Sequence, residues 1–313
     1  FFGFGAGAEP KIMRDYADLC KSEIYLIEVC NIDSYLSFFS EISILDFLKF
    51  FMSSLNEAFY VLKDIGDSGL PFGRVILDSI SFRLVEYSFF RSWFRAVSNS
   101  TSITIDQSCF ISSEISAFAA VQECLDVIYI QHGLLSRSVI FPSVHRFYTL
   151  TVEERDYLTE FLKNTEFLVL KSESLGIQKN KNILVASVYL DSTSLDKSCS
   201  LIRFFSDAGF GVKVRKHPRE DGVYWNNHSF PETFFMTDNA MTFSECLQIE
   251  APMFVCSWYS TALLDSLRAG STPVSFCEPS DPIWERLIYP LKEKVLFWPR
   301  DRNVIAQLID ADC

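Results

Sequence analysis

The sequence lacks the cysteine patterns that mark zinc sites and disulfide-bonded scaffolds. Its nine cysteines are odd in number and scattered, and none forms a CxxC pair or lies at zinc-binding spacing from a histidine. This absence excludes a small protein built around metals or disulfides. We interpret the cysteines as free thiols in a reducing compartment, so we expect a cytoplasmic protein.

Long apolar runs and an excess of positive charge are also missing. No charge-free apolar run approaches the roughly 20 residues that cross a bilayer, so we expect a soluble protein, or one held peripherally at the inner face of the inner membrane. The aromatic stretch FFRSWFRAV (89 to 97) could touch such a surface, but we prefer a core-facing helix. The net charge of −12 excludes broad nucleic-acid binding. A small anionic ligand stays open, because one local basic cluster could bind it.

What the sequence does contain is a globular composition long enough for two domains. Of its 313 residues, 49% are hydrophobic and 22% are charged, and a single core seldom grows to this size. We place an N-terminal domain at residues 1–165 and a C-terminal domain at 166–299. A helix at 300–313 could pack back on the N-terminal domain.

Helical patterns are clearest in the N-terminal half. Between residues 32 and 62 apolar residues recur at a spacing of three, Leu45 and Leu48 among them, which predicts a helix with a buried face. Thr151 followed three residues later by Glu154 has the capping-box pattern and predicts a helix start.

Short apolar strands alternate with helices in both halves, which predicts an α/β protein with parallel sheets. The expected strands are 102 to 105, 127 to 130, 183 to 190, 211 to 218, 253 to 257 and 272 to 276. Ligands of open α/β sheets collect at the carboxyl ends of the strands. The polar residues just beyond these ends are Asp106, Gln131, His132, Gly133, Asp191, His217, Pro218 and Ser257 to Thr261.

The segment KVRKHPRED surrounds His217 with cations, including Arg215 and Lys216, and Pro218 stops the strand so that the histidine meets the cleft. Such a cluster suits the phosphate of a sugar nucleotide. The alternative is an exposed basic strand end with an ordinary surface histidine.

The segment from Ser257 through Ser260 and Thr261 precedes a helix that runs to Gly270. Hydroxyls and backbone N–H groups at a helix N-terminus form an anion site, which the helix dipole strengthens. The alternative is plain N-capping by serine or threonine.

These motifs resemble those of a known group of enzymes. His217-Pro218 and Ser257 to Thr261 are similar to the HP and Ser/Thr motifs of bacterial transferases that use CMP-sialic acid or CMP-Kdo. The phrase STALLDSLRAGSTPVSF resembles a helix and strand of GT-B glycosyltransferases, with Asp265 where glutamate is usual. Gln131-His132-Gly133 resembles the QHG turn of capsule and lipopolysaccharide transferases. The resemblance covers residues 102 to 290 in several short motifs.

The resemblance implies a GT-B fold, with two Rossmann-like domains around a cleft, the acceptor-side one at 1–165 and the donor-binding one at 166–299. It also implies a CMP-sugar donor without a further cofactor. His217 together with Ser257, Ser260 and Thr261 would hold the CMP phosphate. No DxD motif ends a strand, so we expect a metal-independent enzyme in which cationic groups stabilise the leaving phosphate.

A carboxylate would then deprotonate the acceptor or attack the anomeric carbon. Asp191 is the first candidate, Glu114 the second and Asp106 the third, and helix capping or solvation is the alternative reading of each. The acidic pair followed by glycine of bacterial sialyltransferases occurs here only after the HP pair, as Glu220-Asp221-Gly222. His132 could position the acceptor or the sugar carboxylate.

The function expected from this pattern is transfer of a 3-deoxy-ulosonic acid, with Kdo favoured, to a glycan or lipid-linked glycan acceptor in bacterial surface polysaccharide synthesis. Sialic acid or another nonulosonic acid is the nearest alternative, because both donors are CMP ketosides with a carboxylate. A CDP-polyol phosphotransferase and a non-catalytic nucleotide-sugar-binding domain also remain open.

Overall fold

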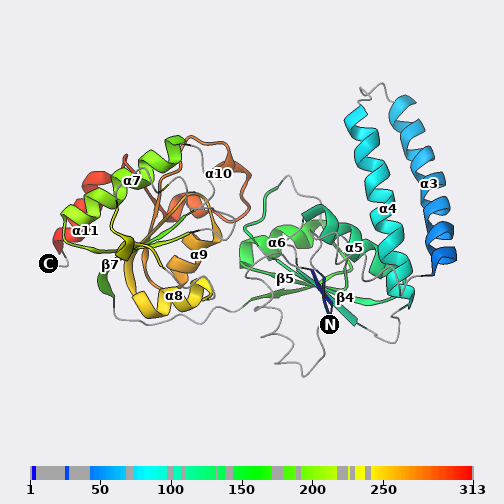
Figure 1. Ribbon diagram of the computed structural model, residues 1–313, viewed down its shortest axis with the longest axis horizontal. Helices are drawn as coiled ribbons and strands as arrows, with labels where there is room; N and C mark the ends of the chain where they lie inside the picture. Colours follow the sequence, from blue (N-terminus) through cyan, green and yellow to red (C-terminus); the bar gives the residue numbers. More distant parts are fainter. Residues whose placement is uncertain are drawn as a thin grey trace. The chain divides into compact units, whose positions relative to one another are not determined.

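The chain forms two compact units in this computed structural model (Figure 1). Unit 1 comprises Phe1–His132 and Val139–Leu170, and unit 2 comprises Gly133–Ser138 and Lys171–Cys313. The structure describes residues 2–4, 25–27, 43–67, 74–96, 102–106, 110–131, 133–137, 144–170, 179–187, 192–216, 225, 230–236 and 241–311, some of them by their backbone alone.

A four-stranded parallel sheet forms the centre of unit 1. Its strands follow chain order, and they are β3 (Ser102–Asp106), β4 (Asp126–Ile130), β5 (Arg146–Thr149) and β6 (Glu166–Val169). Helix α5 (Phe110–Gln122) connects β3 to β4, which confirms the predicted βαβ unit. Strand β1 (Phe2–Phe4) pairs in parallel with β2 (Tyr25–Ile27) and contacts β3.

Helix α6 (Val152–Phe161) joins β5 to β6 and begins with the predicted capping box. The Thr151 hydroxyl accepts the Glu154 backbone N–H at 3.2 Å, and Glu154 Oε2 accepts the Thr151 N–H at 3.1 Å. Both side chains are buried. Because two of the helix's N-terminal N–H groups are satisfied in this way, the sequence pattern alone is enough to place the helix start.

Helices α3 (Ile44–Asp67) and α4 (Arg74–Ala96) form a hairpin that projects from the sheet of unit 1 (Figure 1). The aromatic side chains of the FFRSWFRAV stretch, Phe89, Phe90, Trp93 and Phe94, are at most 2% exposed, so the prediction of a core-facing helix is confirmed.

The predicted buried face of the helix at 32 to 62 is wrong for two of the residues on which it rests. Leu45 is 79% exposed and Leu48 is 49% exposed, whereas Phe50 and Ser54 are buried. The cause is the pairing of α3 with α4, because a hairpin covers only the side of a helix that faces its neighbour. The predicted residues before Ser43 lie outside the described residues.

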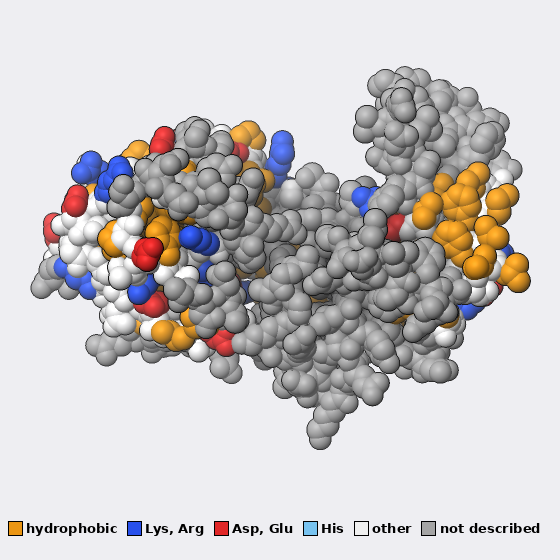
Figure 2. Space-filling view, viewed as in Figure 1, with side chains coloured by type: hydrophobic (Ala, Val, Ile, Leu, Met, Phe, Trp, Pro, Cys, Tyr) orange, Lys and Arg blue, Asp and Glu red, His pale blue; other side chains and the backbone are white. Residues whose placement is uncertain are grey.

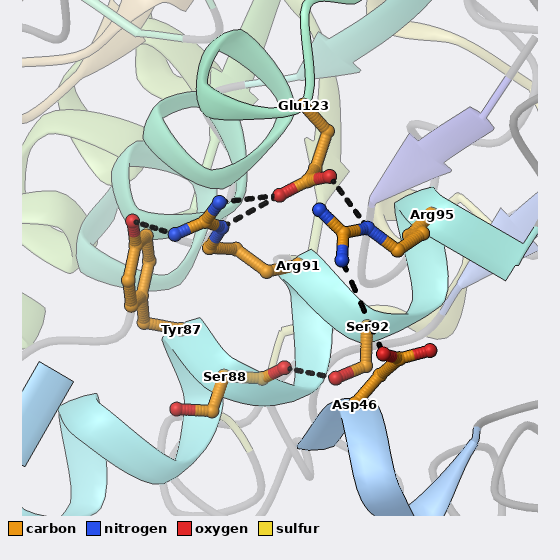
Figure 3. A network of polar contacts seen from close by, with 7 residues as sticks. All are labelled: Asp46, Tyr87, Ser88, Arg91, Ser92, Arg95 and Glu123. Atoms are coloured by element: carbon orange, nitrogen blue, oxygen red, sulfur yellow. Dashed lines mark hydrogen bonds and ion pairs between the residues drawn. The ribbon is translucent and has the colours of Figure 1, made fainter. Parts of the chain in front are cut away.

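A polar network ties this hairpin to α5 (Figure 3). Arg91 Nη2 lies 2.6 Å from Glu123 Oε1, and Arg95 Nε donates to Glu123 Oε2 at 3.1 Å. Both guanidinium groups also lie over the ring of Phe50, at 4.3 and 4.7 Å from its centroid. One carboxylate at the end of α5 thus fixes two turns of α4, and the two cations hold α3 through Phe50.

Unit 2 is built around a five-stranded, wholly parallel sheet. Its strands lie in the order β11-β10-β9-β7-β8, with bounds Leu296–Phe297, Thr272–Ser275, Pro252–Ser257, Asn180–Ala186 and Gly211–Arg215. The helices between them are α7 (Ser192–Asp207), α8 (Phe243–Glu250), α9 (Thr261–Arg268), α10 (Ile283–Arg286) and α11 (Arg302–Ala311). The predicted alternating series of the C-terminal half is therefore confirmed.

The core of unit 2 includes the last helix of the chain. Ile305 and Ile309 of α11 are buried in the same cluster as Phe205 and Phe254, so α11 packs within unit 2 and not back on the N-terminal domain. The division after residue 170, in place of 165, follows from β6, which pairs with β5.

The short segment 133–138 also belongs to unit 2. After it the chain returns to unit 1 for residues 139–170, and the rest of the chain belongs to unit 2. The backbone of segment 133–138 is held by two hydrogen bonds with the loop around α10. Arg137 N–H donates to the Arg286 carbonyl at 2.8 Å and Ile288 N–H donates to the Leu135 carbonyl at 3.0 Å, and together they form the antiparallel β-bridge between Ser136 and Leu287.

Candidate functional site

The order of strands in unit 2 defines where a ligand can bind. Chain order runs outward from β7 in both directions, to β8 on one side and to β9 on the other. At such a switch point the connections leave on opposite faces of the sheet, and a crevice opens at the carboxyl ends of the two central strands. These ends are Ala186 of β7 and Ser257 of β9, which lie on neighbouring strands.

Ser257 joins the two strand ends through its side chain. Its hydroxyl is fully buried, donates to the Ala186 carbonyl at 3.0 Å and lies 3.0 Å from the Ser260 hydroxyl. The predicted substrate-binding residue Ser257 therefore shapes the edge of the sheet from within. Ser275 plays a similar part at the end of β10, where its hydroxyl donates to the Trp258 carbonyl at 2.8 Å.

Ser260 is the N-cap residue of α9, yet its side chain makes no capping hydrogen bond. Its backbone is extended, at φ −149° and ψ 164°, and its hydroxyl is held by Ser257. The first N–H groups of an α-helix have no partner within the helix. The Leu263 N–H donates to the Ser260 carbonyl at 3.1 Å. The start of α9, including Thr261, places the remaining backbone donors and a positive dipole end at the switch point. The alternative of plain side-chain capping does not apply to Ser260.

The basic segment after β8 lies at the same edge of the sheet. Ser187 N–H, just beyond β7, donates to the Arg215 carbonyl at 2.9 Å. Arg215 also donates through Nη2 to the Met241 carbonyl at 2.7 Å, so its guanidinium holds the loop before α8. Lys216 Nζ lies 4.8 Å from the centre of the Phe235 ring. Of the two cations, Lys216 is the better placed to meet an anion, because Arg215 is already engaged.

Asp265 is a further polar residue of this helix, which the pattern of polar residues at strand ends does not predict. It lies one turn beyond Thr261 in α9, burial raises its pKa to about 6, and Arg268 at 3.5 Å opposes that rise. The signal was present in the sequence, because Asp265 stands where the resembled helix motif has glutamate.

Two of the site residues predicted in the N-terminal half, Gln131 and Gly133, lie just after β4. Gln131 is buried, and its side-chain Oε1 accepts the Leu150 backbone N–H at 2.8 Å. Its backbone N–H donates to the Tyr148 carbonyl. It therefore fixes the end of β5. At Gly133 a Cβ atom would meet no other atom within 4 Å, so sterics do not demand glycine there.

Glu114 has the electrostatic property expected of a proton-transferring group. It lies in the second turn of α5, the helix that follows the carboxyl end of β3, and it is half-buried. Desolvation raises its pKa to about 7. A carboxyl group with this pKa exchanges its proton near neutral pH, which suits general acid or base catalysis.

Several predicted site residues lie outside the described residues, namely Asp191, His132, His217 and Pro218, together with the side chain of Asp106. The backbone of Asp106 ends β3, as the sequence predicts. Among the residues that are described, no three His, Cys, Asp or Glu side chains gather as a metal site would require. Within the same residues, no helix combines the length and apolar character that crossing a bilayer requires.

Two parallel sheets with helices between their strands, one of them with a topological switch point between β7 and β9, define an α/β protein with two Rossmann-like units. Comparison with solved structures gives the same class. The crystal structure of MurG from Acinetobacter baumannii matches with a TM-score of 0.51 and 8% identity, over 99% of this chain and 89% of that chain. The predicted GT-B fold class is thereby confirmed.

Two further matches are weaker. UDP-N-acetylglucosamine 2-epimerase from Rickettsia bellii has a TM-score of 0.48 and 13% identity, over 88% of this chain and 78% of that chain. The glycosyltransferase SnogD from Streptomyces nogalater has a TM-score of 0.47 and 11% identity, with coverage of 91% and 84%. No protein-family model matches the sequence, and no curated protein matches it.

Proposed function

We propose that the protein is a metal-independent glycosyltransferase that moves a 3-deoxy-ulosonic acid, Kdo in the first place, from its CMP donor to a glycan acceptor. The observation that carries this proposal is the start of α9, where Ser260 lies at the switch point of the sheet without capping its helix. A GT-B fold like that of MurG supports transfer of a sugar. The ulosonic acid donor rests on the sequence motifs.

The start of α9 suits the phosphate of a CMP-sugar. Backbone N–H groups and the Thr261 hydroxyl would donate to the phosphate oxygens, and the Ser260 hydroxyl would turn from the Ser257 oxygen to do the same. Lys216 and His217 would supply positive charge. A CMP-ulosonic acid carries a carboxylate beside the anomeric carbon as well as the phosphate. Such a donor would use more than one cationic group, which fits the basic segment after β8.

The reaction would proceed by displacement at the anomeric carbon. The acceptor hydroxyl oxygen forms the new bond to that carbon, the bond from the carbon to the phosphate oxygen breaks, and CMP leaves with the electron pair. The acceptor proton passes to a carboxylate. Stabilising the charge on the departing CMP is the task of the α9 start, and no metal is needed for it.

Glu114 is the base that the electrostatics support best. Its pKa of about 7 leaves a large ionised fraction at neutral pH, and it binds the proton more firmly than an ordinary carboxylate does. Asp191 stays a candidate as base or nucleophile from its place after β7, and Asp106 from its place at the end of β3. His132 is proposed to position the acceptor or the donor carboxylate.

Other functions share parts of this site. Transfer of sialic acid or another nonulosonic acid would use the same residues, because the donor has the same charged groups. A CDP-polyol phosphotransferase would also release CMP but would form a phosphodiester. A nucleotide-sugar-binding domain without activity would keep the phosphate contacts and would tolerate loss of Glu114 and Asp191.

Titration of the protein with CMP, UMP, UDP and CDP tests the donor class directly. We expect CMP to bind most tightly and its affinity to fall when His217→Ala removes the imidazole. CMP-Kdo and CMP-sialic acid would then be offered as donors with glycan acceptors, and the product would be identified as ketoside or phosphodiester. Tighter binding of UDP than of CMP would overturn the donor assignment and leave the fold.

A further inference from the structure

Helix α3 has apolar residues on two faces, of which α4 covers only one. On the inner face Phe50 is 4% exposed beneath the Arg91 guanidinium. The outer face has a row of large apolar side chains with exposed fractions from 44% to 79%, namely Leu45, Leu48, Met52 and Leu55. In Figure 2 the described part of α3 carries a broad hydrophobic patch, at the right of the view.

The spacing of this outer row is that of a coiled-coil seam. The intervals between Leu45, Leu48, Met52 and Leu55 are three, four and three residues, which are the a and d positions of a heptad. In the sequence the same spacing continues to Phe59 and Leu62, whose side chains lie outside the described residues. A regular heptad row favours pairing with another helix along its whole length.

The outer row is presented on a helix that is already fixed. Asp46 Oδ1 of α3 lies 4.0 Å from Arg95 Nη1, and Arg95 and Arg91 both contact Glu123 (Figure 3). Both guanidinium groups also lie over the Phe50 ring. These contacts hold the first turns of α3 against α4 from the inner side. The row therefore needs little ordering on association, which favours binding.

The charge of α3 argues against a lipid surface as the occupant. The helix contains two lysines and four acidic residues (Asp46, Glu57, Asp64 and Asp67), a net charge of 2 − 4 = −2, and the whole chain has −12. Helices that lie on anionic membranes carry lysine and arginine on their polar face. A second copy of the chain meets no such mismatch in the seam, because identical apolar rows pair about a two-fold axis.

We propose that the protein forms a homodimer through its α3 helices, which pack against each other along the Leu45, Leu48, Met52 and Leu55 row. A 24-residue helix is about 36 Å long and presents roughly 14 residues at its a, d, e and g positions. Stable standard interfaces use about 20 to 30 residues on each side. The contact is therefore at the small end of the range, and the dimer is reversible and depends on concentration.

Sedimentation velocity of the whole chain over a hundredfold range of concentration tests this interface. The wild type is expected to shift from the 35.9 kDa monomer toward twice that mass as concentration rises. Met52→Glu buries a carboxylate on each side of the seam and is expected to raise the dimer dissociation constant by roughly 100-fold or more.

Ile249→Glu on α8 is the matched control, because Ile249 and Met52 are both 63% exposed on helices. It is expected to dimerise like the wild type, and circular dichroism checks that both variants are folded. A wild type that stays monomeric throughout would overturn the proposal, as would equal weakening by both variants. Binding of the monomer to phosphatidylglycerol vesicles that is lost in Met52→Glu would show that a membrane, and not a second copy, covers the row.

Discussion

Helices α8 and α9 both belong to unit 2 and both begin after a hydroxyl residue, but their N-termini are satisfied in different ways. At α8 the Thr242 hydroxyl accepts the Glu245 N–H at 3.2 Å, and Glu245 Oε2 accepts the Thr242 N–H at 2.6 Å. At α9 the Ser260 hydroxyl makes no capping bond and lies 3.0 Å from the Ser257 hydroxyl.

The difference shows how one residue type serves two purposes. The capping box of α8 uses its polar side chains to satisfy the helix itself, so that little is left for a ligand. At α9 the Ser260 hydroxyl lies against Ser257 and does not cap the helix, which begins at the switch point of the sheet. We therefore propose that the start of α8 serves stability and that the start of α9 binds a phosphate.

A substitution in unit 1 can separate the chemical step from the binding of CMP. Glu114→Gln in unit 1 removes the proposed base and is expected to lower turnover by about 10² to 10⁴ while CMP affinity stays unchanged. Wild-type activity should rise through pH 7 as Glu114 loses its proton, and that rise should be absent in the variant. These effects would be measured as initial rates across pH with CMP-Kdo as donor.

The same substitution has an opposite expected effect on stability. Because the folded-state pKa of Glu114 is raised from its ordinary value of 4.5 to about 7, the folded state loses stability as pH rises from about 4.5 to about 7, and the loss stays constant at higher pH. Glutamine does not ionise, so Glu114→Gln should unfold at equal or higher urea concentration than the wild type at pH 8. A variant that is both inactive and unstable would indicate a structural role instead.

Ser257 contributes both to the stability of unit 2 and to the proposed phosphate site, and Ser257→Ala is expected to weaken both. The change removes the hydrogen bond to the Ala186 carbonyl and the contact with Ser260, so it should lower the free energy of unfolding by about 1 to 3 kcal/mol. CMP affinity should fall as well. Ser266→Ala is the control, because Ser266 is equally buried but its hydroxyl donates within α9, to the Leu263 carbonyl.

Thr242→Ala should act on stability alone. Loss of an N-cap side chain lowers the free energy of unfolding by about 1 kcal/mol, which urea denaturation can measure. CMP affinity should stay at the wild-type value, because the Thr242 hydroxyl is already bonded within α8. A clear loss of CMP affinity in this variant would break the distinction between the two helices.

Features set by local chemistry could be predicted from the sequence. The capping box of Thr151 and Glu154 depends on residues three apart, and the strands at 102 to 105 and 253 to 257 depend on short apolar runs. The place of Ser257 at the carboxyl end of its strand could be predicted too, because it depends on the same apolar run.

Features that depend on which elements meet could not be predicted. The apolar spacing around Leu45 and Leu48 indicates a helix face that avoids water, but not what covers it, and α4 covers the other side. Likewise the sequence around Ser260 is compatible with capping or with a ligand site. Only the position of Ser257, whose hydroxyl is held by the carbonyl of a neighbouring strand, shows why the Ser260 side chain does not cap its helix.

The measurement that tests the central claim most directly is calorimetric titration of CMP into the wild type, Ser260→Ala and Thr242→Ala. We predict that Ser260→Ala weakens CMP binding about tenfold, the value of one hydrogen bond to a charged group, and leaves the free energy of unfolding within about 0.5 kcal/mol of the wild type. Thr242→Ala should show the reverse pattern. Unchanged CMP affinity in Ser260→Ala, or equal loss in both variants, would contradict the assignment of the α9 start as the phosphate site.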